Sequence, residues 1–92
     1  MESYRFIVSG KVQHVYYRKS VAQALQRLGV QGYVRNRNDG TVEVVARLYD
    51  DQYDALVAAL EAGSPLSRVD QIDATQLDTD DIVYDGFEIR YD

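Results

Sequence analysis

Apolar residues in this chain follow two different spacings. Near the start, Tyr4, Phe6 and Val8 occupy every second position, which predicts a strand with one buried face. Two later stretches repeat apolar residues every three or four positions, the spacing of a helix that buries one side. The first is Tyr17, Val21, Leu25 and Leu28, ended by Gly29, and the second is Tyr53, Leu56, Val57 and Leu60, ended by Gly63 and Pro65.

The region between the two helices predicts a β-hairpin. The extended runs "QGYVRN" (31–36) and "TVEVVARL" (41–48) flank "RNDG" (37–40). Asp-Gly between two extended runs is a strong hairpin pattern, because both residues accept the backbone angles of a tight turn.

The segment after the second helix predicts two more strands. "RVDQIDATQL" (68–77) forms the first, and "DTDDIVYDG" (78–86) follows it as a turn-rich acidic loop. In "GFEIRYD" (86–92), Phe87, Ile89 and Tyr91 occupy alternate positions, which predicts a final strand.

The order of these elements predicts an α+β fold. Neither helix can bury its apolar side alone, but both can pack on one face of a sheet. We therefore expect a ferredoxin-like βαββαβ sandwich, in which an antiparallel sheet of four to five strands carries two helices on one face. No repeat or linker divides the chain, so residues 1–92 form one domain.

Length and composition narrow the function classes. The 92 residues are 46% hydrophobic and 27% charged, which is ordinary for a soluble globular protein. No apolar run approaches the roughly 20 residues of a membrane span. The start has no secretory pattern and the chain has no cysteine, so we expect a cytoplasmic protein without disulfides or thiolate metal sites. Nothing in the sequence argues against a monomer.

Charge is distributed unevenly within the net value of −5. Residues 1–47 hold eight Lys and Arg against three Asp and Glu, and residues 48–92 hold two against twelve. A chain this acidic is a poor general binder of nucleic acid. The basic half can still hold one small anion, and a solvated charged surface is the simpler alternative.

The segment "VQHVYYRKS" (12–20) contains the residues that such an anion site needs. It carries donors and positive charge but no carboxylate, and it lies just before the first helix. If that helix begins near Arg18, the backbone N–H groups of residues 14–18 lack helical partners and can bind phosphate, carboxylate or sulfate. The helix dipole adds about 0.3–1 kcal/mol, and a charge-assisted bond from Arg18 adds roughly 1.5–3 kcal/mol.

Several segments together resemble the acylphosphatase family in order and spacing. They are "GKVQHVYYR" (10–18), "GYVRNRNDGTVEVVA" (32–46), "GSPLSRVDQI" (63–72) and "GFEIRY" (86–91), so the resemblance covers nearly the whole chain. It implies a ferredoxin-like fold and metal-free hydrolysis of the carboxyl-phosphate bond of small acyl phosphates, with no cofactor. It also implies that Arg18 and Asn36 are the catalytic residues. The phosphate-binding loop is then His14, Val15, Tyr16, Tyr17 and Arg18.

This assignment agrees with the chemistry of acyl phosphates. The leaving carboxylate has a conjugate acid with a pKa of roughly 4, so it departs without a general acid. The loose transition state spreads charge over the phosphoryl oxygens, which positioned donors stabilise. Asn36 can hold the attacking water, although an Asn before "RNDG" can instead be a turn residue that bonds its own backbone.

Two residues depart from the family pattern, which usually has Gly at the position of His14 and Phe at that of Tyr17. A Gly there indicates a positive φ or a close approach of the ligand, and His adopts that conformation more readily than most residues. We therefore expect His14 to affect rate and affinity more than fold, and Tyr17 to lie in the core. The other possibility for His14 is a role as base or extra anion donor.

Alternative functions and sites remain at this point. Because His14 stands where the family usually has Gly, the chain could instead be a catalytically impaired anion-binding module of the same fold. An RNA-binding domain of this topology is disfavoured, because "TVEVVARL" has no aromatic residue in its middle.

The acidic residues Asp78, Asp80, Asp81 and Asp85 lack the spacing of a calcium loop, and a single His without Cys gives no zinc site. The sequence also leaves open whether Asp92 or the terminal carboxylate orients Arg18.

Overall fold

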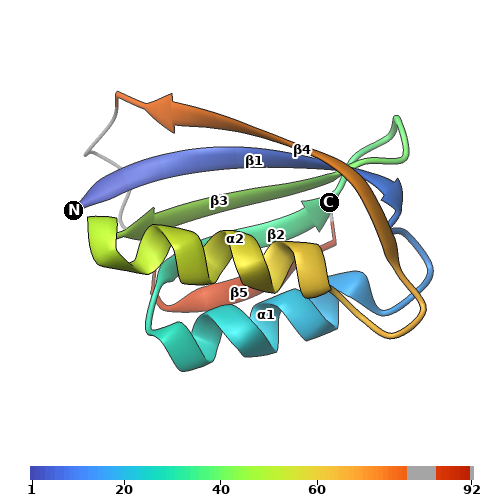
Figure 1. Cartoon of the computed structure of the whole chain (residues 1–92), viewed down its shortest axis with the longest axis horizontal. Coiled ribbons are helices and arrows are strands. Elements are labelled where there is room, and N and C mark those ends of the chain that lie inside the picture. Colours follow the sequence, from blue (N-terminus) through green and yellow to red (C-terminus); the bar gives the residue numbers. More distant parts are fainter. Residues whose placement is uncertain (79–84, 92) are drawn as a thin grey trace.

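The computed structural model describes residues 1–78 and 85–91, and it has the predicted α+β architecture. One sheet carries both helices on the same face (Figure 1). The elements in chain order are β1 (Glu2–Lys11), α1 (Tyr17–Leu28), β2 (Gln31–Asn36), β3 (Val42–Leu48), a short 3-10 turn (Asp50–Gln52), α2 (Tyr53–Ala62), β4 (Arg68–Leu77) and β5 (Phe87–Arg90). The βαββαβ order, with β5 as an additional strand, and the ferredoxin-like class are thus confirmed.

The five strands lie in the order β4-β1-β3-β2-β5. The first three pairings are antiparallel, as expected, but β5 lies parallel to β2, with Gly32 opposite Phe87 and Val34 opposite Ile89. The expectation of a wholly antiparallel sheet was wrong on this point. β5 runs opposite to β4, and β2 already has that direction, so pairing along the edge of β2 must be parallel.

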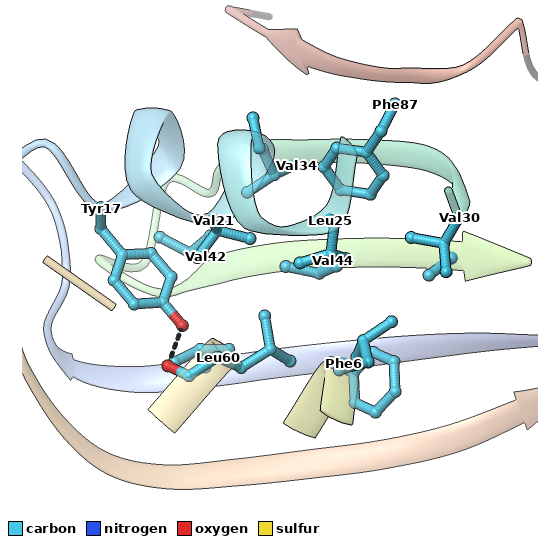
Figure 2. Close-up of a cluster of buried hydrophobic side chains, with 14 of the residues drawn as sticks. Phe6, Tyr17, Val21, Leu25, Val30, Val34, Val42, Val44, Leu60 and Phe87 are labelled. Carbon is cyan, nitrogen blue, oxygen red and sulfur yellow. Dashed lines mark hydrogen bonds between the residues drawn. The ribbon is translucent and has the colours of Figure 1, made fainter. Parts of the chain in front are cut away.

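The core lies between the sheet and the two helices. Alternate residues of the strands, including Phe6, Val34 and Val44, point toward the helices and are fully buried. They meet Leu25 of α1 and Leu60 of α2 (Figure 2). Each such side chain contributes about 1.5–3 kcal/mol by leaving water, so this packing fixes how α1 sits against the sheet.

Tyr17 joins the start of α1 to the end of α2. The residue is 1% exposed, and its hydroxyl donates a 2.7 Å hydrogen bond to the carbonyl of Leu60 (Figure 2). Burial raises the pKa of the Tyr17 phenol well above its ordinary value. Tyr17 is therefore a core residue, as the sequence predicted, and it anchors the first turn of α1.

The turn between β2 and β3 forms at the Asp-Gly pair. The N–H of Arg37 donates to the carbonyl of Thr41 at 2.9 Å, and the carboxylate of Asp39 accepts from the N–H and hydroxyl of Thr41. The predicted hairpin is confirmed, and it fixes the end of β2 where Asn36 lies.

Neither helix in the described residues has the length and hydropathy needed to cross a bilayer.

Candidate active site

The loop between β1 and α1 contains two residues in the left-handed region of backbone space. His14 has φ of 63° and Tyr16 has φ of 62°, and Tyr16 is the residue that caps α1. Residues other than glycine seldom adopt this backbone conformation, and holding one in it costs on the order of 1–3 kcal/mol. The positive φ at His14 is the geometry for which a glycine is suited, so His14 occupies a strained turn position.

The backbone N–H groups of this loop are available as hydrogen-bond donors within the described part of the chain. Among the residues that the structure describes, no acceptor takes a hydrogen bond from the N–H groups of residues 14–18. The first bond of the helix runs from the N–H of Ser20 to the carbonyl of Tyr16. The loop and the first turn of α1 therefore present a set of free donors at a positive helix end.

An open cleft of about 490 Å³ lies beside these donors. Its lining comes from the loop, the first turn of α1, the end of β2 and the last residues of the described chain. The lining residues are Val12, His14, Tyr16, Tyr17, Arg18, Lys19, Asn36, Ile89 and Tyr91. The structure thus brings together Arg18 and Asn36, which are 18 positions apart in the sequence. Val15 is the one predicted loop residue that does not line the cleft, because its side chain is buried in the core.

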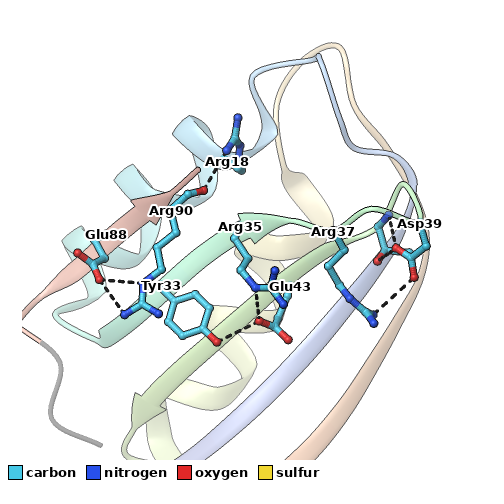
Figure 3. A network of polar contacts seen from close by, with 9 residues as sticks. Arg18, Tyr33, Arg35, Arg37, Asp39, Glu43, Glu88 and Arg90 are labelled. Carbon is cyan, nitrogen blue, oxygen red and sulfur yellow. Dashed lines mark hydrogen bonds and ion pairs between the residues drawn. The ribbon is translucent and has the colours of Figure 1, made fainter. Parts of the chain in front are cut away.

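Arg18 is half-buried in the first turn of α1, and its orientation is fixed from the other end of the chain. Its Nη1 donates a 3.0 Å hydrogen bond to the carbonyl of Arg90 (Figure 3). The guanidinium also lies 4.7 Å from the centre of the Tyr91 ring. Its other N–H groups have no acceptor in the described part of the chain, so they can reach an anion in the cleft.

Asn36 is the last residue of β2, and its side chain lies on the same sheet face as Val34. The Oδ1 atom is buried and has no hydrogen-bond partner among the described residues. Asn36 therefore does not bond its own backbone as an ordinary turn residue would. A buried oxygen without a hydrogen-bond partner lowers the stability of the fold by about 1–3 kcal/mol unless a ligand or water donates to it.

The described residues that line the cleft give it positive charge. His14, Arg18 and Lys19 supply nitrogen groups, and none of these described lining residues is Asp or Glu. The cleft therefore suits an anion, although the chain as a whole carries a net charge of −5.

Sequence reasoning missed part of this lining. Lys19 directly follows Arg18 and could have been included with it. Tyr91 was expected to alternate within the last strand, but β5 ends at Arg90 and Tyr91 is 79% exposed. Its position against Arg18 depends on the pairing of β5 with β2, which no local pattern reveals.

In residues 1–78 and 85–91, no group of three or more His, Asp and Glu residues could hold a metal ion. Asp80 and Asp81 of the acidic loop, together with Asp92, lie outside the described residues.

Comparison with known proteins identifies the family. The family model described as "Acylphosphatase" matches residues 4–89. The chain belongs to the acylphosphatase family. An acylphosphatase of Thiobacillus denitrificans is 40% identical over 92 residues, which cover 100% of both chains. One from an Acidovorax species is 45% identical over 83 residues, covering 90% of this chain and 84% of that relative.

A solved structure agrees with this family. The crystal structure of acylphosphatase from Bacillus subtilis superposes with a TM-score of 0.92 at 35% identity, and covers 99% of this chain and 100% of that one. The chain is an acylphosphatase, an enzyme that hydrolyses acyl phosphates. The resemblance noted in the sequence is confirmed, and membership of this family favours an enzyme over an impaired anion-binding module.

Proposed function

We propose that this cleft hydrolyses small acyl phosphates without a metal ion, by direct attack of a water molecule on the bound phosphoryl group. Arg18 and the loop N–H groups hold the phosphoryl oxygens, and Asn36 positions the water. One observation carries the proposal. Among the described residues, free loop N–H groups, an Arg18 guanidinium with one N–H bonded to Arg90, and an Asn36 Oδ1 atom without a partner meet at one cleft.

The loop and Arg18 have complementary roles in holding the anion. Backbone N–H groups of residues 14–18 are fixed donors, and they need no reorganisation when charge spreads over the phosphoryl oxygens. The guanidinium adds planar, bidentate hydrogen bonding and a permanent positive charge. Its bond to the Arg90 carbonyl fixes the plane in which the remaining N–H groups point.

Asn36 lies where a water molecule can approach the phosphoryl group. The unpartnered Oδ1 atom can accept a hydrogen bond from that water and direct its lone pair toward phosphorus. The water oxygen bonds to phosphorus as the bond to the carboxylate oxygen breaks. The proton released by the water passes to a phosphate oxygen, and the products are a carboxylate and inorganic phosphate.

No general acid is required, because the departing carboxylate is stable at neutral pH. His14 is exposed and lines the cleft, and we assign it a structural role in the turn rather than a role in proton transfer. We further propose that the protein acts as a cytoplasmic monomer with small acyl phosphates as its ligands and without nucleic acid or cofactor.

The test is the hydrolysis of acetyl phosphate in the presence of EDTA by the wild-type protein and by Asn36→Ala. We expect turnover by the wild type. In Asn36→Ala, kcat should fall at least about a hundredfold, because the proposed interaction is made mainly in the transition state.

Inorganic phosphate, tested as a competitive inhibitor, separates the roles of the two residues. Its affinity should change little in Asn36→Ala, since Asn36 acts on water. If phosphate binding is lost together with turnover, Asn36 contacts the anion or supports the fold, and the assigned role is wrong.

A further inference from the structure

Ser64 is a buried polar residue that contacts the loop between β1 and α1. It lies between α2 and β4, and its side chain is covered by the protein. The hydroxyl donates a short hydrogen bond to the carbonyl of Val15. Val15 lies between His14 and Tyr16, the two residues with positive φ. Ser64 therefore holds the peptide at the centre of the strained loop.

The backbone N–H and carbonyl groups of Ser64 both form hydrogen bonds with the side chain of Ser67. Its N–H donates to Oγ of Ser67 at 2.9 Å, and its carbonyl accepts from the same hydroxyl at 2.8 Å. Gly63, with φ of 54°, lets this segment lie against Tyr17, because a Cβ there would come within 2.7 Å of the Tyr17 ring. Both backbone groups of Ser64 are thus occupied, and only its hydroxyl is left for Val15.

Fixing the Val15 carbonyl also fixes an N–H group on the other side of the same peptide. In a trans peptide the C=O and the following N–H point in opposite directions, and the described residues contain no cis peptide. The Val15 carbonyl points inward to Ser64, so the N–H of Tyr16 points away from Ser64. Tyr16 lines the cleft, whereas Val15 and Ser64 do not.

We infer that Ser64 is a positioning residue for the reaction, which aims the N–H of Tyr16 at the bound phosphoryl group by holding the carbonyl of Val15. The inference rests on the proposed function of the cleft. It accounts for a conformation that is unfavourable at both His14 and Tyr16, because the bond to Ser64 selects this orientation of the peptide between them. Without the hydroxyl, the Val15 carbonyl would be buried without a partner and the peptide would favour a tilt toward other donors.

The inference is tested by titrating the ¹⁵N-labelled protein with inorganic phosphate and following the backbone amides by NMR. In the wild type, the resonance of the Tyr16 amide proton should move downfield when the protein is saturated with phosphate, as expected for an N–H group that donates directly to an anion. In Ser64→Ala, this shift should be reduced, and phosphate should bind about tenfold more weakly. Ser64→Thr keeps the hydroxyl and should restore both.

Ser3→Ala is the matched control. Ser3 is also a buried serine, but it lies at the opposite end of β1 from the loop. Its replacement should change thermal stability without altering phosphate affinity or the Tyr16 amide. Equal losses of phosphate affinity in Ser3→Ala and Ser64→Ala would mean that general destabilisation is the cause, and would overturn the inference.

The wild-type titration can overturn the inference even if Ser64→Ala does not fold. Phosphate binding with no response of the Tyr16 amide overturns the role of Ser64 while leaving the proposed function in place. An absence of phosphate binding overturns the proposed site and this inference with it.

Discussion

At the scale of single residues, Arg18 shows how a contact outside the cleft prepares a contact within it. One guanidinium N–H is held by the Arg90 carbonyl, and the Tyr91 ring lies 4.7 Å away. We expect Arg18→Ala to lower kcat/KM for acetyl phosphate at least about a hundredfold and to weaken inhibition by inorganic phosphate. Arg18→Lys should also be poor, because an ammonium group cannot give planar, two-point contact.

Arg27→Ala is a suitable control for Arg18→Ala. Arg27 is exposed in the last turn of the same helix, so its loss removes one positive charge away from the cleft. Kinetics close to those of the wild type are expected. Near-wild-type turnover in Arg18→Ala would contradict the assignment of Arg18.

A second prediction at this scale concerns the activity of a variant in which His14 is replaced by glycine. Its φ of 63° suits glycine, so His14→Gly should relieve strain and open the mouth of the cleft. Activity should be equal or higher, and the pH profile between about 5 and 8 should keep its shape. The measurement is kcat for acetyl phosphate across this pH range.

The opposite result would give His14 a role in the chemistry. That result is a lower kcat with an inflection lost from the pH profile, in a protein that circular dichroism shows to be folded. We expect the first outcome, because the leaving carboxylate needs no proton and the loop N–H groups already supply donors.

The sequence revealed some of the residues around the cleft and not others, for a physical reason. Arg18 and Asn36 lie within motifs whose spacing can be recognised along the chain. Ser64 and Tyr91 come to the site from distant segments, through packing of the α2–β4 connection and pairing of β5. Both lie in segments that resemble the family, but the local sequence does not indicate which part of the fold they contact.

At the scale of elements, Gln13 connects the loop to the hairpin that carries Asn36. Its side-chain amide donates to the carbonyl of Arg37 at 2.8 Å and to that of Thr41 at 2.9 Å. These carbonyls lie on either side of the β2–β3 turn. Gln13 therefore helps to set the distance between the proposed phosphate-binding loop and the proposed water-binding residue.

We predict that Gln13→Met lowers kcat about tenfold with a smaller change in phosphate affinity, because it loosens Asn36 relative to the loop. In an Asn36→Ala background, the same change should have little further effect, since the two residues act on the same step. The kinetics of the two single variants and the double variant measure this coupling.

Gln26→Met provides the matched control for Gln13→Met. Gln26 also donates a side-chain hydrogen bond to a backbone carbonyl, that of Phe87 at 2.9 Å, but does not line the cleft. Its replacement should leave kcat close to that of the wild type. A similar loss of kcat in both variants would show that Gln13 acts through stability alone.

Local patterns predicted most elements well, because their ends carry local chemistry. The apolar spacing that begins at Tyr17 and ends before Gly29 gave the bounds of α1, and Gly29 caps it with φ of 76°. The parallel pairing of β5 was missed, because the alternation of Phe87 and Ile89 indicates a strand but does not indicate its neighbour.

At the scale of the whole molecule, a protein with a net charge of −5 has a cleft lined by Arg18 and Lys19 and by no described Asp or Glu. Any anion that binds the folded state there, and not the unfolded chain, must stabilise the protein by mass action. At a phosphate concentration ten times its Kd, this stabilisation is about 1.4 kcal/mol. For a domain of this size, it corresponds to a rise in Tm of about 6 to 11 °C.

Thermal unfolding with and without phosphate therefore tests the site independently of turnover. Arg18→Ala should lose most of the rise in Tm, because the guanidinium is the main cationic partner of the anion. Arg5→Ala should keep it, since Arg5 is an exposed residue on the sheet face away from the helices. Chloride at the same ionic strength separates specific binding from screening, which acts on charges throughout the surface. If chloride raises Tm as much as phosphate does, or if Arg18→Ala and Arg5→Ala respond alike, the anion does not bind in the cleft.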